Sequence, residues 1–231
     1  MAKNSAAINY HEKLATKWDD RYKKGGFKRR AALFKNQLLP LVPSGGEWLD
    51  AGCGSGFFSR HLATKQSKVT GLDGSQSMIT QARSLAATAG LGNNTNFEIV
   101  DTIEKIDFDS GSFDGCICLS VLEYLPNAFR CLDEITRILK PNGYFILSVP
   151  NSLSIVRFVQ KAFAKNKRGP EHSSLEYLAT SLFVQTPKDL HAELEKRGFE
   201  IIYFTGFDTY IPNKLHFLFP PSLIYVVARK I

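Results

Sequence analysis

The stretch EWLDAGCGSGFFS, residues Glu47–Ser59, decides how this chain folds. It opens with strand-forming residues, continues through Asp50 and glycines at 52, 54 and 56, and ends in a helical apolar pattern that begins at Phe57. Glycine allows a backbone to approach a ligand where a Cβ would clash, and the first N–H groups of a helix are unpaired. The stretch therefore predicts a strand, a tight glycine turn and a helix at a nucleotide-type site, although a glycine cluster alone also fits a plain turn.

A second acid, Asp73, stands at the end of another apolar run, 69–72. A carboxylate there can accept hydrogen bonds from two ribose hydroxyls, as in nucleoside cofactors bound at the carboxyl ends of parallel strands. The glycines depart from the dinucleotide fingerprint G-x-G-x-x-G, because Gly56 comes one residue early. Asp50 would repel a pyrophosphate, and at the mouth of the loop it suits a ligand with an ammonium group. A nicotinamide-dependent oxidoreductase that uses the same loop is the alternative interpretation.

Composition places the chain among ordinary globular proteins. It has 231 residues, of which 44% are apolar and 22% charged, so we expect a single large domain. The sequence shows no apolar run of membrane-spanning length and no signal-peptide core, which predicts a cytoplasmic protein. The four cysteines, at 53, 116, 118 and 131, are interpreted as reduced, buried thiols without metal-site spacing.

The net charge of +7 has two interpretations. Nucleic-acid binding would require a basic stripe interleaved with aromatics or a recognisable module, and the sequence shows neither. The charge instead indicates a basic surface that attracts acidic small molecules or anionic lipid heads. We therefore expect a small-molecule substrate and no nucleic-acid partner.

Strand and helix patterns alternate from residue 46 to 150, which predicts a parallel sheet covered on both faces. The run at 115–120 is uninterruptedly small and apolar, as in a strand buried on both faces. Ser75 is predicted to cap one helix and Thr186, followed by Pro187, another. The expected strands are 46–51, 67–72, 97–100, 115–120, 144–149, 199–204 and 223–228. The prediction is an α/β, Rossmann-like three-layer sandwich with a mostly parallel seven-stranded sheet.

The spacing D-x-G-x-G-x-G at 50–56 resembles the first motif of class I S-adenosylmethionine methyltransferases. Two later phrases, FDSGSFD at 108–114 and ILKPNGYFILSVPN at 138–151, are also similar to phrases of that family, with Asn142 in place of a glycine. The resemblance implies S-adenosyl-L-methionine as cofactor, S-adenosyl-L-homocysteine as product, and an antiparallel pairing of the last two strands at the sheet edge.

The resemblance also implies a cofactor site. In it Asp101 would accept a hydrogen bond from the adenine amino group, and Arg29 or Arg30 would pair with the cofactor carboxylate. The candidate cofactor residues are Tyr10, Trp18, Arg30, Asp50, Ala51, Gly52, Cys53, Gly54, Gly56, Asp73, Gly74, Ser75, Met78, Asp101, Thr102, Leu119 and Ser120.

The whole chain, 1–231, is predicted to be one methyltransferase domain. Its parts are an N-terminal helical lid at 1–45, the cofactor-binding core at 46–150, a substrate cap at 151–186, and a C-terminal helix with two strands at 187–231. Apolar spacing predicts a lid helix over 5–24 that ends at Gly25, with Trp18 either over the cofactor or packed on the core. Residues 153–168 predict a basic amphipathic helix that covers the substrate pocket or, less favoured, contacts a membrane surface or a lipid-like substrate.

The segment after the fourth strand is similar to the E-x-L-E-H phrase of ubiquinone-biosynthesis O-methyltransferases, whose acids and histidine are associated with a metal. Here the corresponding residues are Ser120, Glu123 and Tyr124, so two of three are changed and no metal is predicted. Glu123 and Tyr124 are candidate catalytic residues. Among the histidines, His172 is the candidate general base, and His216 is also expected to face substrate. The predicted reaction is methylation of a small molecule at a hydroxyl oxygen, with an amine nitrogen as the alternative.

Overall fold

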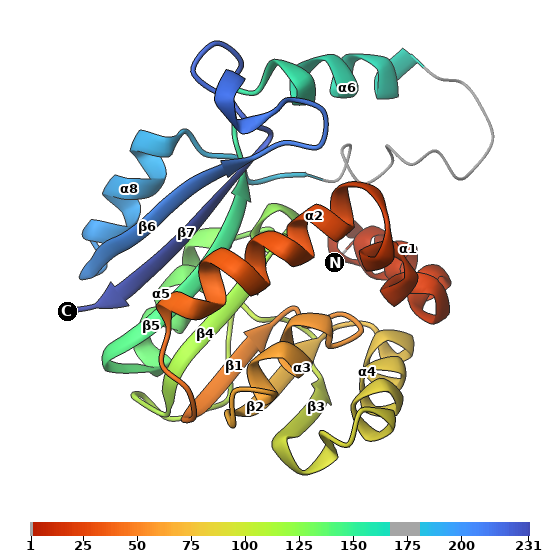
Figure 1. Cartoon of the computed structure of the whole chain (residues 1–231), viewed down its shortest axis with the longest axis vertical. Helices are drawn as coiled ribbons and strands as arrows, with labels where there is room; N and C mark the ends of the chain where they lie inside the picture. The colour runs from red at the N-terminus through yellow and green to blue at the C-terminus, as the bar shows by residue number, and fades with distance from the viewer. Residues whose placement is uncertain (1, 167–180) are drawn as a thin grey trace.

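The computed structural model describes residues 2–166 and 181–231, which contain one seven-stranded sheet with helices on both faces (Figure 1). The strand order is β3-β2-β1-β4-β5-β7-β6. Every neighbouring pair is parallel except that β7 is antiparallel to both β5 and β6. The strands are β1 Glu47–Ala51, β2 Lys68–Asp73, β3 Thr95–Ile99, β4 Phe113–Leu119, β5 Leu139–Pro150, β6 Phe199–Phe207 and β7 Leu223–Lys230. The predicted fold class is confirmed.

The described α-helices are α1 Ala2–Trp18, α2 Gly25–Leu33, α3 Phe57–Ala63, α4 Gln76–Thr88, α5 Ala128–Ile138, α6 Ile155–Asn166 and α8 Pro187–Glu195. Apolar side chains of α5 and α8 pack on one face of the sheet, and those of α2 and α3 pack on the other. Strand β4 supplies both layers: Cys116 and Cys118 face the first, and Ile117 faces the second. The prediction that this strand is buried on both faces is confirmed.

Local capping signals position two of these helices as predicted. The Ser75 hydroxyl accepts a hydrogen bond from the Met78 N–H at 3.1 Å, so α4 begins directly after the end of β2. The Thr186 hydroxyl accepts one from the Asp189 N–H at 3.0 Å at the start of α8. Each cap satisfies an N–H group that the first helical turn leaves unpaired.

Two predicted boundaries are wrong. The first helix ends at Trp18 and is followed by a tighter 3₁₀ turn at Asp19–Lys23, and Gly25, at φ +58°, begins α2 instead of ending the helix before it. Strand β5 starts at 139, ahead of the predicted turn, which forms an irregularity in its pairing with β4. Asn142 has a φ of +64° there, the left-handed conformation that its side chain tolerates.

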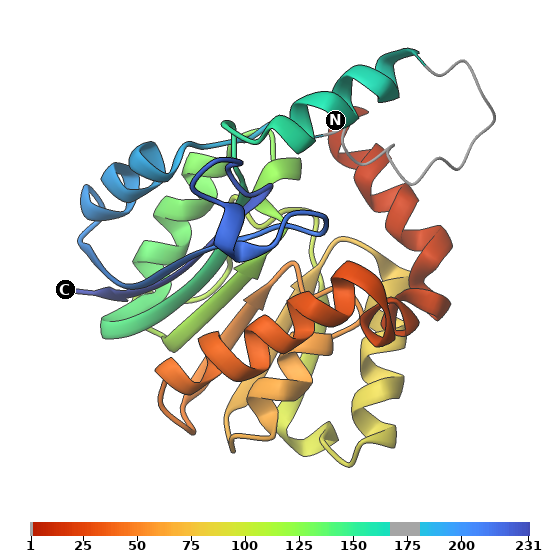
Figure 2. The ribbon, with the colours of Figure 1, turned by 45° about the horizontal axis from the view of Figure 1, so that its top comes forward.

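The segment 208–222, which precedes β7, lies beside α6 at one end of the sheet, as both ribbon views show (Figure 2). Side chains from the two elements together line a surface cavity. Residues 167–180 of the predicted cap, including His172, lie outside the described residues. Within the described chain, every helix is too short or too polar to cross a lipid bilayer.

Candidate functional site

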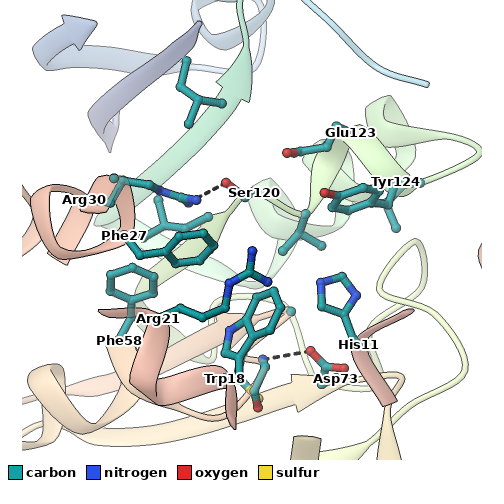
Figure 3. Close-up of a pocket in the computed structure, with 18 of the residues that line it drawn as sticks. His11, Trp18, Arg21, Phe27, Arg30, Phe58, Asp73, Ser120, Glu123 and Tyr124 are labelled. Carbon is teal, nitrogen blue, oxygen red and sulfur yellow. Dashed lines mark hydrogen bonds between the residues drawn. The ribbon is translucent and has the colours of Figure 1, made fainter. Parts of the chain in front are cut away.

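A cavity of about 380 Å³ opens at the carboxyl ends of β1, β2 and β4, a volume within the range of small-molecule sites (Figure 3). Its wall includes residues from α1, α2, α6 and the 208–222 segment as well as the loops that follow the strands. The predicted cofactor residues on this wall are Trp18, Arg30, Gly52, Cys53, Gly54, Asp73, Gly74, Asp101, Thr102, Leu119 and Ser120. The structure therefore brings most of the predicted site together.

The glycine loop is pinned to the neighbouring strand. The N–H groups of Gly52 and Cys53 both donate to the carbonyl of Leu72, at 2.8 and 2.9 Å. Gly54, at φ +52°, is open: among the described atoms, a Cβ there would meet only the Trp18 ring nitrogen, at 3.8 Å. A side chain at 54 would thus project into the cavity, which is why glycine suits this position.

Asp73 connects the loop to the start of α4. One carboxylate oxygen accepts the Gly54 N–H at 2.8 Å and the other accepts the Ser75 N–H at 2.9 Å. Burial raises the pKa of this carboxyl. Each carboxylate oxygen can accept a further hydrogen bond, so the group is suited to receiving a pair of hydroxyls.

Five predicted cofactor residues lie behind the wall. The predicted position of Asp50 at the loop mouth is wrong, because its side chain is 2% exposed and accepts a hydrogen bond from the Ser59 hydroxyl on α3. Gly56 is absent from the wall because its Cα packs on the Phe97 ring, where a Cβ would lie 2.8 Å from the ring. The others are Ala51, Ser75 and Met78, all buried.

We predict that Asp50 makes the stability of the protein pH-dependent. Burial raises the pKa of its carboxyl to about 7, whereas the unfolded value is about 4. The folded protein therefore holds a proton that the unfolded chain loses, and stability falls as pH rises through this window. The difference in free energy of unfolding between Asp50→Asn and the unsubstituted protein should therefore shift in favour of the variant from about pH 4 to about pH 7 and stay constant above that. Denaturant titrations across this range measure it, and parallel curves for the two proteins would contradict the assignment.

The N-terminal segment contributes an aromatic wall. Trp18 and Phe27 lie edge to face, 5.8 Å between centroids, and the Arg21 guanidinium lies 4.6 and 4.4 Å from their ring centroids. Figure 3 shows Arg21 directed into the cavity. Trp18 both lines the cavity and packs within its own segment, so the two interpretations of it are compatible. The side chain of Tyr10 lies outside what the structure describes.

A clamp joins this segment to the glycine loop. The Asp19 carboxylate accepts hydrogen bonds from the Arg60 guanidinium and from the Ser55 hydroxyl. Arg60, on α3, is 9% exposed and also donates to the Ser55 carbonyl at 2.6 Å. Because Ser55 lies within the loop, the clamp fixes the N-terminal segment over the cavity.

Asp19→Ala should lower the free energy of unfolding by on the order of 2 kcal/mol, because it leaves the Arg60 guanidinium without its counter-ion. Hydrogen exchange in α1 and α2 should also rise, since the clamp no longer holds the segment down. Asp20→Ala is the matched control: its ion pair with Lys23 is on the surface, with side chains 61% and 77% exposed, and should change little. Equal effects of the two substitutions would rule out the clamp.

The other end of the cavity is basic. The Arg30 guanidinium donates to the Tyr225 hydroxyl at 2.7 Å and to the Ser120 hydroxyl at 2.6 Å. Ser120 has a φ of +58°, and its N–H donates to the Ser148 hydroxyl at 2.9 Å. Of the two arginine candidates, only Arg30 lines the cavity, because Arg29 points outward to the Thr209 carbonyl.

The candidate catalytic residues lie on a short 3₁₀ turn, Leu122–Tyr124, and both Glu123 and Tyr124 line the cavity. Glu123 is 4% exposed, burial raises its pKa, and its Oε2 has no hydrogen-bond partner in the described structure. A carboxyl whose pKa is raised is a stronger base than an exposed one, so Glu123 is a candidate proton acceptor.

The histidine predictions need correction. His216 is absent from the cavity wall, because its ring nitrogen turns to the Ile211 carbonyl at 3.2 Å. His11 lines the cavity instead, with its ring 4.9 Å from Trp18 and 6.0 Å from Tyr124. The signal was available, because positions 11 and 18 are two helical turns apart and share a face.

The residues present fit an S-adenosylmethionine-type ligand. The backbone at Gly54 is bare, and Asp73 offers acceptors for a pair of hydroxyls. Asp101 lies on the same wall, and cationic groups stand at the opposite end. The sheet order, with β7 antiparallel next to the edge, and the make-up of this site are similar to those of class I S-adenosylmethionine-dependent methyltransferases.

Comparison with known proteins leads to the same class. Residues 49–147 match the family model described as "Methyltransferase domain", and this core of the chain is a domain of that kind. An Arabidopsis thaliana cycloartenol-C-24-methyltransferase is 33% identical over 57% of this chain and 39% of the relative. A Coxiella burnetii ubiquinone biosynthesis O-methyltransferase is 36% identical over 45% of this chain and 43% of the relative. The matches thus span about two fifths of those relatives' length.

Solved structures share the fold over nearly the whole chain. A magnesium protoporphyrin IX methyltransferase from Synechocystis PCC 6803, solved with bound S-adenosylhomocysteine, superposes with a TM-score of 0.73 at 19% identity, over 98% of this chain and 99% of that one. An S-adenosylmethionine-dependent methyltransferase from Methanosarcina mazei has a TM-score of 0.67 at 25% identity, over 85% of this chain and 97% of that one. The cofactor of this class is S-adenosyl-L-methionine.

Proposed function

We propose that this protein transfers a methyl group from S-adenosyl-L-methionine to a hydroxyl oxygen of a small molecule. One observation carries the proposal: a single cavity connects the Gly54–Asp73 side, which fits the cofactor, to the buried carboxyl of Glu123. Methylation of a hydroxyl requires a site for the methyl donor and a proton acceptor close to it, and this wall offers groups for both.

The cofactor half would be held by groups at both ends of the cavity. Asp73 would accept the ribose hydroxyls, Asp101 the adenine amino group, and Arg30 would face the cofactor carboxylate. When bound, the cofactor supplies a methyl group already activated by its positive sulfur. The aromatic rings of Trp18 and Phe27 would exclude water from the reacting atoms.

The acceptor half would use the 3₁₀ turn after β4. Glu123 would take the proton from the acceptor hydroxyl, and Tyr124 would position the acceptor beside it. A neutral amine needs no base before transfer, so the buried carboxyl favours oxygen over nitrogen. The relatives are named for both O- and C-methylation, and both therefore belong in a substrate screen.

The helix α6 would cover this acceptor half, because Val156 and Gln160 line the cavity. Its outer side is apolar: Phe158 is 75% exposed and Ile155 53%. Contact with a lipid-like acceptor or a membrane surface through this side is an extension of the proposal. The division of the chain into lid, core, cap and C-terminal part is likewise a proposal.

The test is equilibrium binding of S-adenosylmethionine followed by transfer of its labelled methyl to phenols, hydroxy acids, sugars, amines, sterols and other lipids. We expect saturable binding that is lost in Gly54→Arg, whose side chain would occupy the cavity. We also expect label to enter a hydroxylated compound. Tight NAD binding without S-adenosylmethionine binding would instead support the oxidoreductase alternative.

A further inference from the structure

Three guanidinium groups, those of Arg21, Arg30 and Arg157, line the cavity together with the carboxyls of Asp73, Asp101 and Glu123. Arg21 lies against the Trp18 and Phe27 rings, and Arg30 donates to the Tyr225 and Ser120 hydroxyls. Burying a cation without a counter-ion is costly, so a buried guanidinium that lacks such partners calls for an anion.

Arg157 is buried but poorly paired. It lies on α6, is 7% exposed, and its Nε has no hydrogen-bond partner in the described structure. To the residues that the structure describes, its side chain makes one long hydrogen bond, from Nη2 to the Ser181 hydroxyl at 3.4 Å. Within residues 2–166 and 181–231 no carboxylate lies within 4.0 Å of its guanidinium.

Glu123 does not serve as that counter-ion. Arg157 lowers the pKa of Glu123, yet none of the ion pairs in the described part of the chain joins the two side chains. Both retain an unpartnered atom, an N–H donor on Arg157 and an acceptor on Glu123. The pair therefore presents a hydrogen-bond donor and a hydrogen-bond acceptor to a ligand that binds between the cap helix and the core.

We propose that the methyl acceptor carries a carboxylate, which Arg157 binds while Glu123 receives the acceptor hydroxyl. This assignment rests on the proposed function and names its substrate class, a hydroxylated carboxylic acid. A guanidinium matches the planar, singly charged carboxylate through two parallel hydrogen bonds. A doubly charged phosphate would be repelled more strongly by Glu123, which makes carboxylate the better match.

The test compares a matched pair of ligands, 3,4-dihydroxybenzoate and 3,4-dihydroxybenzamide, by calorimetry on the full chain saturated with S-adenosylhomocysteine. The acid should bind roughly tenfold more tightly than the amide, as expected for one charge-assisted contact. Arg157→Gln should abolish this preference. Arg130→Gln is the control, since Arg130 is exposed on α5 and is not among the residues that line the cavity; it should keep the preference.

Arg157→Lys keeps the charge without the planar fork and should keep part of the preference, which guards against a Gln variant that folds poorly. Failure of the acid to bind better than the amide, or a preference that survives in Arg157→Gln, overturns the assignment. Affinity for S-adenosylhomocysteine is measured in the same proteins and should be unchanged by Arg157→Gln. If the native chain binds no S-adenosylhomocysteine, the proposed function itself fails.

Discussion

Asp73→Asn should weaken binding of S-adenosylhomocysteine by about a hundredfold. The native carboxylate accepts N–H groups from Gly54 and Ser75, one on each oxygen. Asparagine keeps one acceptor oxygen and turns an NH₂ group toward the other N–H, so one loop contact becomes a clash of donors. One ribose hydroxyl would also lose its charged acceptor. Two such losses, each about 1.5 kcal/mol or more, give the expected factor.

The measurement is calorimetric titration of the native and variant proteins, accompanied by their thermal unfolding midpoints. Asp109→Asn is the matched control, because Asp109 is exposed and its side chain makes no described hydrogen bond. The control should leave the affinity unchanged. Native-like affinity in Asp73→Asn would mean that Asp73 supports the loop but does not contact the ligand.

Gly52→Ala should lower the free energy of unfolding by about 3 kcal/mol and abolish cofactor binding. At φ +81° an L-residue is strained by about 1–2 kcal/mol. The new Cβ would also lie 2.7 Å from Cγ1 of Val121 and nearer still to its Cγ2. Valine is stiff at χ1, so relief requires a backbone shift in the loop after β4, with a further cost of about 1–3 kcal/mol.

The variant Gly90→Ala separates the backbone strain at positive φ from the steric clash with Val121. Gly90 has a similar φ of +70°, but a Cβ there would meet no atom of the described residues within 4 Å. It should therefore show the strain alone and keep cofactor binding. The double variant Gly52→Ala, Val121→Ala should recover part of the lost stability, because it removes the clashing methyl groups. Equal destabilisation by Gly52→Ala and Gly90→Ala would rule out the clash with Val121 as a cause.

If both results hold, the acceptor site becomes the open question. Glu123 and Arg157 come from different elements, the turn after β4 and the cap helix, and each keeps an unsatisfied buried atom. Unsatisfied buried polar groups are uncommon in folded proteins and cluster where a ligand completes them. The substrate screen should therefore begin with hydroxylated acids.

Most of the fold could be predicted from the sequence because its signals are local. The caps at Ser75 and Thr186 each involve residues three positions apart. The glycine turn between β1 and α3 depends on backbone freedom that only glycine supplies. Alternation of strand and helix patterns then fixes a parallel sheet, because a crossover helix must cover each face.

The positions of individual side chains in the candidate site were less predictable than the fold. Asp50 was expected at the loop mouth, but the loop turns it inward to Ser59, where burial raises its pKa. His11 shares a helix face with Trp18, but it meets Tyr124 only after α1 folds across the cavity. Nothing in the spacing of the cap helix distinguishes Arg157 from the other basic residues near it.

By itself the sequence determined the sheet, the glycine loop and Asp73 at the end of β2, because short-range backbone preferences and hydrophobic periodicity specify them. Only the tertiary structure decided which polar groups face one another. Arg30 meets Ser120 across 90 positions of the chain and Tyr225 across 195. Such pairings carry no local signal, since they arise when helices from distant parts of the chain pack over the same strand ends and must satisfy their buried charges together.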